Sequence, residues 1–182
     1  MRRLVMVFLA ASLCLAPGAY GSASDNALID AAIQCNLAQV QSLLSKGANA
    51  NARHQNGTTV LMFAAARCNL PMVQALLGKG AQVNAKGSED GRTVLIWAAI
   101  GGNLPIVQTI LAKGAEINAQ ANDGDTPLNS AARKGRLDVV KFLLAKGAQV
   151  NVQDKTGKTA LWSAENKGHT EIAKVLRQAG AK

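Results

Sequence analysis

The chain has 182 residues, of which 48% are hydrophobic, and it carries a formal net charge of +9. This length is enough for one continuous repeat domain. Aromatic residues make up only 3% of the chain, too few for the stacking platforms that bind nucleic acids, so the positive charge does not indicate a nucleic-acid-binding protein. After the N-terminal segment, no stretch is apolar for long enough to cross a membrane.

Residues 1–23 have the pattern of a secretory signal peptide. Two arginines precede an apolar run over 4–15, and a proline and a glycine then lead into small residues. The run has about 12 residues, too few for a membrane anchor, which needs roughly 20. We expect cleavage after Gly21 or after Ala23, which removes both arginines and lowers the net charge from +9 to +7. The protein is then expected in the periplasm or outside the cell, with membrane contact only during export.

The tripeptide Lys-Gly-Ala recurs after the leader at an almost fixed interval. Its glycines at positions 47, 80, 114 and 147 are 33, 34 and 33 residues apart, and Gly180 continues the spacing in a degenerate fifth copy. A period of this size indicates stacked supersecondary units rather than one closed core. We expect one domain over 24–182 with five units, about 26–54, 55–87, 88–120, 121–153 and 154–182.

Each full unit reads as two helices. A turn and a Thr-x-Leu element precede a short helix with small residues, and the second helix has apolar residues at i, i+3 and i+4, as in Val107, Ile110 and Leu111. Pro71 and Pro105 fall where a second helix starts, a position that tolerates proline. The glycine of Lys-Gly-Ala suits a left-handed helix cap, and the lysine lies near the negative end of the helix dipole. Four of the positive charges are therefore predicted to cap helices.

These units resemble ankyrin repeats. The family motif Thr-Pro-Leu-His-x-Ala is nearest over 126–131, and Gly-Ala-x-Val-Asn is matched over 147–151. The resemblance covers about 26–182 and implies an all-α solenoid of about five helix-turn-helix units with short β-hairpin tips, in which the terminal units act as caps. The motif histidine is replaced by Met62, Ile96, Asn129 and Trp162, so its usual hydrogen bond to the motif threonine is expected to be absent or altered.

By resemblance, an ankyrin stack binds its partner on the concave face, through the tips and the ends of the first helices. Phe63 and Trp97 occupy the same place in adjacent first helices, where they either pack between units or, if exposed, act as binding hot spots. We prefer Trp97 as the anchor. The predicted partner-binding residues are Arg53, Arg67, Glu89, Asp90, Arg92, Trp97, Asp123, Asp125, Arg133, Lys134, Lys155, Lys158 and Lys167. Five of these residues form a basic cluster at the C-terminal end: Arg133, Lys134, Lys155, Lys158 and Lys167. This cluster is either an ordinary solvated surface or a surface that steers an acidic partner.

Cys35 and Cys68 occupy the same site in the first two units, where the family usually has the glycine between the helices. An oxidising compartment favours their pairing. The spacing of consecutive units, ~10 Å, exceeds the Cα separation of about 7 Å that a disulfide tolerates, so local bending would be needed. A disulfide that joins the two units and a pair of free thiols both remain open.

No catalytic or metal-binding residues are predicted. His54 and His169 fall in different units, and neither cysteine of the repeats has a histidine or a second cysteine nearby in the sequence. A nucleophile with its base or a zinc site of recognisable spacing is therefore missing. The glycines follow the repeat and form no phosphate-binding loop. We expect a protein that is not an enzyme and that uses no cofactor and no small-molecule substrate.

Together these features predict an exported protein–protein interaction module that binds a periplasmic protein, such as an acidic enzyme, through its concave face. By resemblance to bacterial proteins of this build, which include accessory partners of periplasmic enzymes, the module either inhibits its enzyme, for example a cell-wall hydrolase, or supports it, for example in defence against peroxide. The alternative is a secreted effector that binds a host protein.

Overall fold

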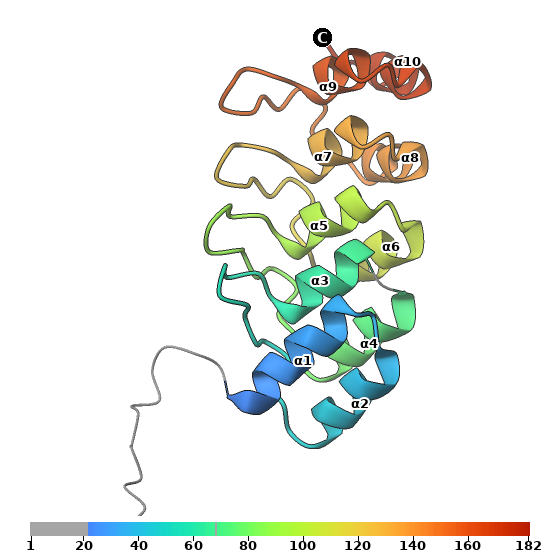
Figure 1. Ribbon diagram of the computed structural model, residues 1–182. Helices are drawn as coiled ribbons and strands as arrows, with labels where there is room; N and C mark the ends of the chain where they lie inside the picture. The colour runs from blue at the N-terminus through green and yellow to red at the C-terminus, as the bar shows by residue number, and fades with distance from the viewer. Residues whose placement is uncertain (1–21, 68) are drawn as a thin grey trace, which may run out of the picture.

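The computed structural model describes residues 22–67 and 69–182. Their ten α-helices form five successive pairs that stack into an elongated solenoid (Figure 1), as the sequence predicts. The first helices of the pairs are α1 (Ala23–Ile33), α3 (Val60–Arg67), α5 (Val94–Gly101), α7 (Pro127–Arg133) and α9 (Ala160–Asn166). The second helices are α2 (Leu37–Ser45), α4 (Leu70–Gly78), α6 (Leu104–Ala112), α8 (Leu137–Ala145) and α10 (Thr170–Gln178). In the described part of the chain, no helix combines the length and the apolar character that a bilayer crossing requires.

Polar side chains start most of these helices. The caps of α2, α4 and α6 are Asn36, Asn69 and Asn103, and those of α5, α7 and α9 are the motif threonines Thr93, Thr126 and Thr159. Each side chain accepts a hydrogen bond from the backbone N–H three residues further on, which satisfies a donor that the helix leaves unpaired. Pro71 and Pro105 lie in the first turn of α4 and α6, as predicted.

Lysine and glycine end the second helices as the sequence predicts. Lys46, Lys79, Lys113 and Lys146 are the C-cap residues, and the following glycines have φ between 82° and 89°. The turn inside each of the last three units also uses a left-handed glycine, with φ between 70° and 82°. Cys35 takes this place in the first unit with φ of 54°, a conformation that costs a residue with a Cβ about 1–2 kcal/mol.

Cys35 is disulfide-bonded. The other two cysteines of the chain, Cys14 and Cys68, lie outside the described residues. The pairing of Cys35 with Cys68 therefore stays a prediction, as does the signal peptide, which falls almost entirely on residues that the structure does not describe.

The packing between units is close because small residues line it. The alanine pairs of α3, α5 and α7 are buried. Gly101 in α5 lies so near α3 that a Cβ there would stand 2.6 Å from the carbonyl oxygen of Ala66. Helices in substantial contact belong either to the same unit or to adjacent units, as expected for a solenoid.

The regular recurrence of asparagine after each Lys-Gly-Ala tripeptide has a structural reason. The Asn51 side chain donates to the carbonyl of Gly80 (3.1 Å) and accepts from the backbone N–H of Gln82 (2.8 Å), so it joins one loop to the next. The same pair of bonds joins Asn84 to Gly114 and Glu116, and Asn151 to Gly180 and Lys182, while Asn118 accepts from Gln149. In the first unit, Asp25 accepts from the N–H of Asn49 instead. We call this series of contacts the asparagine ladder.

Replacing Asn84 by Ala is expected to lower the free energy of unfolding by about 1–2 kcal/mol, because two hydrogen bonds between neighbouring loops are lost. Urea unfolding followed by circular dichroism measures the change. Asn166→Ala, at an exposed position near the end of α9, is the control and should change stability by less than about 0.5 kcal/mol. Equal effects of the two substitutions would contradict a structural role for the ladder.

The predicted β-hairpin tips are mostly loops. Among the described residues, isolated antiparallel bridges join Arg53 to Thr59 and Lys86 to Thr93, and no extended strand forms. We refer to 53–59, 86–93, 120–126 and 153–159 as the tip loops. In the second of these, Gly87 N–H donates to the carbonyl of Arg92, whereas His54 N–H in the first reaches Thr58. The second tip loop is thus one residue longer, as the sequence predicts.

Candidate protein-binding groove

The tip loops lie along one side of the stack, next to the first helices (Figure 1). By resemblance to ankyrin repeats, this is the concave side. One position of the repeat runs along this side and is occupied in turn by Asp30, Phe63, Trp97, Ser130 and Ser163. Asp30 is exposed, the two aromatic residues are half-buried, and the two serines are buried. The groove therefore changes from acidic to aromatic to polar along the stack.

A hollow with a volume of about 280 Å³ lies between the second and third units. Phe63 and Trp97 contribute its aromatic surface, and the carboxylates of Glu89 and Asp90 belong to the adjoining tip loop. Its full lining is Asn56, Thr58, Phe63, Ala66, Arg67, Glu89, Asp90 and Trp97. We call it the aromatic hollow. Four predicted partner-binding residues, Arg67, Glu89, Asp90 and Trp97, thus lie together.

A second, wider hollow of about 870 Å³ opens beside α1 and the first tip loop. Asp25 and Asp30 from α1 and Arg53 and His54 from the tip loop are among its lining residues. Burial raises the pKa of Asp25, but hydrogen bonds that Asn49 and Ser22 donate to its carboxylate outweigh burial and hold the pKa below its usual value. The stability that this carboxylate contributes is therefore present at neutral pH and is lost as the pH falls through the lowered pKa.

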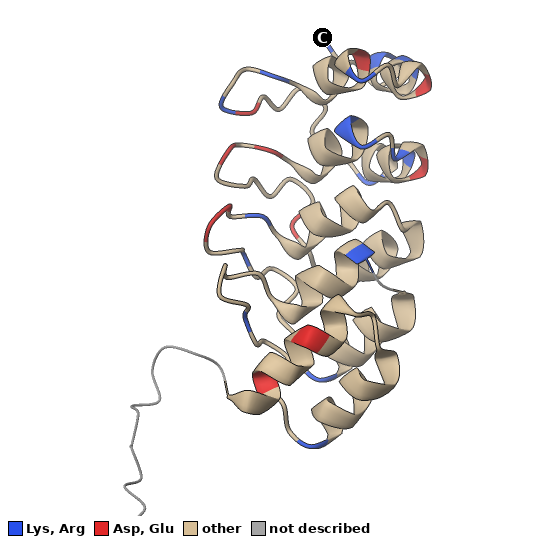
Figure 2. Cartoon of the chain, viewed as in Figure 1, with Lys and Arg blue, Asp and Glu red and all other residues tan. Residues whose placement is uncertain are grey.

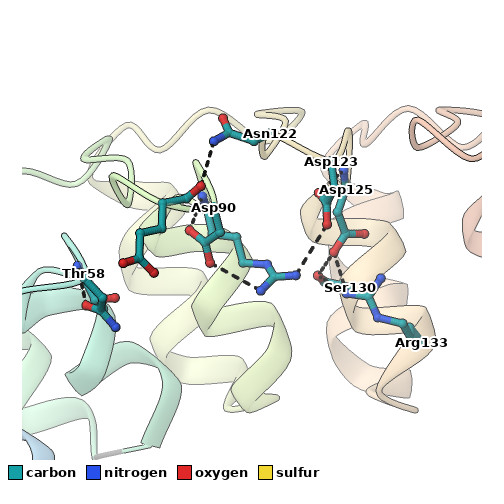
Figure 3. A network of polar contacts seen from close by, with 10 residues as sticks. Thr58, Asp90, Asn122, Asp123, Asp125, Ser130 and Arg133 are labelled. Carbon is teal, nitrogen blue, oxygen red and sulfur yellow. Dashed lines mark hydrogen bonds and ion pairs between the residues drawn. The ribbon is translucent and has the colours of Figure 1, made fainter.

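An ion-pair network crosses the groove from the third to the fourth unit (Figure 3). The Arg92 guanidinium lies 3.4 Å from the Asp90 carboxylate and 3.6 Å from that of Asp123. Its central carbon is 5.7 Å from the ring centre of Trp97, within the range of a cation–π contact. Arg92, Asp90 and Asp123 were predicted as separate contact residues, and the structure joins them in one network.

The prediction that Asp125 contacts a partner from an acidic tip is wrong. The structure buries Asp125, which is only 1% exposed. One of its carboxylate oxygens accepts from the Ser130 hydroxyl and from the Arg133 guanidinium, each at 2.6 Å (Figure 3). Asp125 is therefore a structural residue beneath the groove, and Arg133 is neutralised by it rather than free to contact an acidic partner.

The lysines at the C-terminal end differ in their surroundings. Lys134, Lys155 and Lys167 are exposed. The Lys158 amine instead lies 4.5 Å from the ring centre of Trp162, which is 43% exposed. Trp162 occupies the repeat position of Met62, Ile96 and Asn129, which are 0–2% exposed within the stack. Lys158 thus lies over an exposed aromatic side chain of the last unit.

Asn129 shows what replaces the motif histidine. Its backbone N–H donates to the Thr126 hydroxyl oxygen, and its side chain donates to the carbonyl of Val152 at the end of the same unit (3.2 Å). Met62 and Ile96 instead fill the space with buried apolar side chains. The usual hydrogen bond between the motif histidine and the motif threonine is therefore absent or altered, as predicted, and the units still stack on one another.

Arg53 also has a structural role. Its guanidinium donates to the carbonyls of Gly57 and Lys86, each at 2.8 Å, so it ties the first tip loop to the second. Asn122, at a position where ankyrin repeats contact a partner by resemblance, donates to the carbonyl of Glu89 in the preceding tip loop. Ser130, which lies buried beneath this surface, is absent from the predicted residues. Its repeat position, shared with Phe63 and Trp97, is the signal that could have identified it.

Charge is distributed unevenly along the stack. Helices α4, α5 and α6 carry no charged residue, whereas the tip loops and the helices of the last two units carry both signs (Figure 2). Within the described ranges, no three His, Cys, Asp or Glu side chains come together as metal ligands would. The arrangement offers an open surface for a macromolecule.

A stack of helix pairs with an open groove of this kind defines a repeat-type binding protein. The model of the ankyrin repeat family, built on three copies of the repeat, matches residues 28–121 and 102–182, and the chain belongs to this family. Among curated proteins, none matches the chain significantly. Ankyrin repeats form protein–protein interaction modules and are typically not catalytic, so the family and the groove point to the same class of function.

Proposed function

We propose that the protein is exported and binds another protein through its concave groove, with the aromatic hollow as the anchor site. The main support is the placement of Phe63 and Trp97, two half-buried aromatic residues side by side in a hollow of the groove. Aromatic side chains in such hollows dominate the energetics of many interfaces. The leader pattern and the disulfide of Cys35 support export, since disulfides persist in oxidising compartments.

The partner that suits this groove best is a periplasmic enzyme with an acidic surface, which the module inhibits or supports. The exposed lysines at positions 134, 155 and 167 favour an acidic surface over a basic one. A cell-wall hydrolase and an enzyme of peroxide defence are the two cases to compare. A host protein bound by a secreted effector is the alternative, and the identity of the captured protein decides between them.

Capture from an envelope extract tests the proposal. The exported protein is immobilised, the retained partner is identified and purified, and its affinity for the wild type is compared with that for Trp97→Ala. Loss of an anchor residue should weaken binding more than about fivefold, or 1 kcal/mol.

The control for this experiment is Trp162→Ala, which alters the exposed tryptophan at the end of the stack. Circular dichroism verifies that both variants are folded, and equal affinities for Trp97→Ala and the wild type would exclude the aromatic hollow. The activity of the partner with and without the module then distinguishes inhibition from support.

A separate prediction concerns the exposed lysines. Changing Lys134, Lys155 and Lys167 together to Glu is expected to slow association with an acidic partner about tenfold at low salt, because electrostatic steering is reversed. Stopped-flow association at several salt concentrations measures the effect, which should shrink as salt rises.

The control reverses Lys141 and Lys174, two lysines that are exposed on the outer helices α8 and α10. The same loss of rate per reversed charge in this control would show that only the net charge matters. Unchanged rates in the groove variant would remove the lysines from the binding surface.

A further inference from the structure

We infer that the aromatic hollow accepts an arginine side chain of the partner. The inference rests on the proposed function and specifies the chemistry of the anchor. It follows from the size of the hollow, from its aromatic and carboxylate groups, and from the way in which the protein already holds one of its own arginines against the same tryptophan.

The size and surface of the hollow suit one long, planar side chain. Its volume of about 280 Å³ is large enough to admit one long side chain. Phe63 and Trp97 contribute aromatic rings to its lining, and the ring of Phe63 makes an edge-to-face contact with His54, with ring centres 6.0 Å apart. A guanidinium stacks on such surfaces more favourably than an ammonium does, because it is planar and weakly hydrated.

The charges of the lining favour a cation on the side of the tip loop. Glu89 is exposed and forms no ion pair among the described residues. Asp90, whose side chain is 38% exposed, also faces this side but shares its charge with Arg92. A partner guanidinium would therefore find one unpaired carboxylate and one that is partly neutralised, an arrangement suited to charge-assisted hydrogen bonds.

Arg92 shows that the same residues can hold a guanidinium. It lies over the ring of Trp97 at 5.7 Å while pairing with Asp90. The proposed partner arginine would repeat this combination within the hollow, between the aromatic rings and Glu89. A lysine lacks the planar group that makes both contacts at once.

Arg67, at the end of α3, is the cation of the lining. It disfavours a guanidinium close to the helix end of the hollow, so the side chain is expected to approach from the tip loop. Removing this charge should therefore strengthen binding of arginine, whereas removing Glu89 should weaken it. The opposite signs of these two effects distinguish a specific site from general screening of charge.

The test uses the purified, isotopically labelled protein and its two tryptophans, whose indole N–H signals are assigned with Trp162→Phe. N-acetyl-arginine amide is titrated into the protein, with the uncharged isostere N-acetyl-citrulline amide and N-acetyl-lysine amide as matched probes. We expect the arginine probe to shift the Trp97 signal and to leave the Trp162 signal in place. Citrulline and lysine amides should bind about three- to fivefold more weakly, the effect of one exposed charge pair or cation–π contact.

The variants sharpen the test. Glu89→Gln should weaken arginine amide about threefold, Arg67→Gln should strengthen it about twofold, and Glu116→Gln, at an exposed site in another loop, should have no effect. Equal binding of citrulline amide, equal binding of lysine amide, or no response to Glu89→Gln would overturn the inference.

The arginine inference and the proposed function can fail separately. If the arginine probe gives any of these contrary results while Trp97→Ala still weakens binding of the partner, only the arginine pocket is wrong. If arginine amide binds but Trp97→Ala leaves capture unchanged, the proposed function of the groove is wrong instead.

Discussion

Replacing Ile110 by Ala is expected to lower the free energy of unfolding by about 3 kcal/mol, because truncating a fully buried aliphatic side chain removes apolar burial and leaves a cavity. Ile110 is 0% exposed in α6, in the central unit of the stack. A protein of this size is typically stable by about 5–15 kcal/mol, so the substitution should remove a large share of its stability. Urea unfolding monitored by circular dichroism at two temperatures measures the change.

Leu111 is the matched control for this experiment. It follows Ile110 in the same helix but is only partly buried and lines a hollow beside the second helices α6 and α8. Leu111→Ala should therefore cost about half as much, since less apolar surface leaves water on folding. A larger loss at Leu111 than at Ile110 would show that the central core does not lie where the structure places it.

Replacing Asp125 by Ala is expected to cost about 2–3 kcal/mol of stability. The change removes the acceptor of the buried Ser130 hydroxyl and leaves the Arg133 guanidinium without its partner. Breaking a fully buried pair costs about 3–5 kcal/mol, and the lower figure applies because solvent reaches the Arg133 side chain, which is 31% exposed. Chemical denaturation of the variant measures the loss.

Two further variants separate the network from general surface effects. Asp123→Ala removes a carboxylate that is 56% exposed and 3.6 Å from Arg92, and it should cost less than about 1 kcal/mol. Combining Asp125→Ala with Arg133→Leu should recover part of the stability, because the unpaired charge is removed. If Asp125→Ala were as mild as Asp123→Ala, the buried pair would not be a structural element.

The period of the sequence carried most of the information about the fold. Glycines and lysines that recur every 33 or 34 residues mark helix ends, and the structure uses them in that way at Gly47, Gly80, Gly114 and Gly147. This succeeds because helix caps depend on local backbone geometry, which a single residue can determine. The tips were less predictable, since bridge pairing in so short a loop depends on small differences in backbone direction.

The groove was predicted less well than the fold. The carboxylates Asp123 and Asp125 are two residues apart in one tip loop and look equivalent in the sequence, yet one is exposed and the other is buried. The difference arises from Arg133, eight residues after Asp125, whose approach depends on how α7 leaves the loop. Trp162 was similarly ambiguous, because its repeat position is buried in every unit that another unit follows.

The confinement of contacts to adjacent units has a mechanical consequence. Each unit is held by its own hairpin and at most two neighbours, so thermal opening should begin at the outermost hairpins and progress inward. A ligand seated between Phe63 and Trp97 would bridge two such segments and resist their separation. If the ligand holds these two units together, amide hydrogen exchange in α3 and α5 should slow on complex formation, with little change in α10.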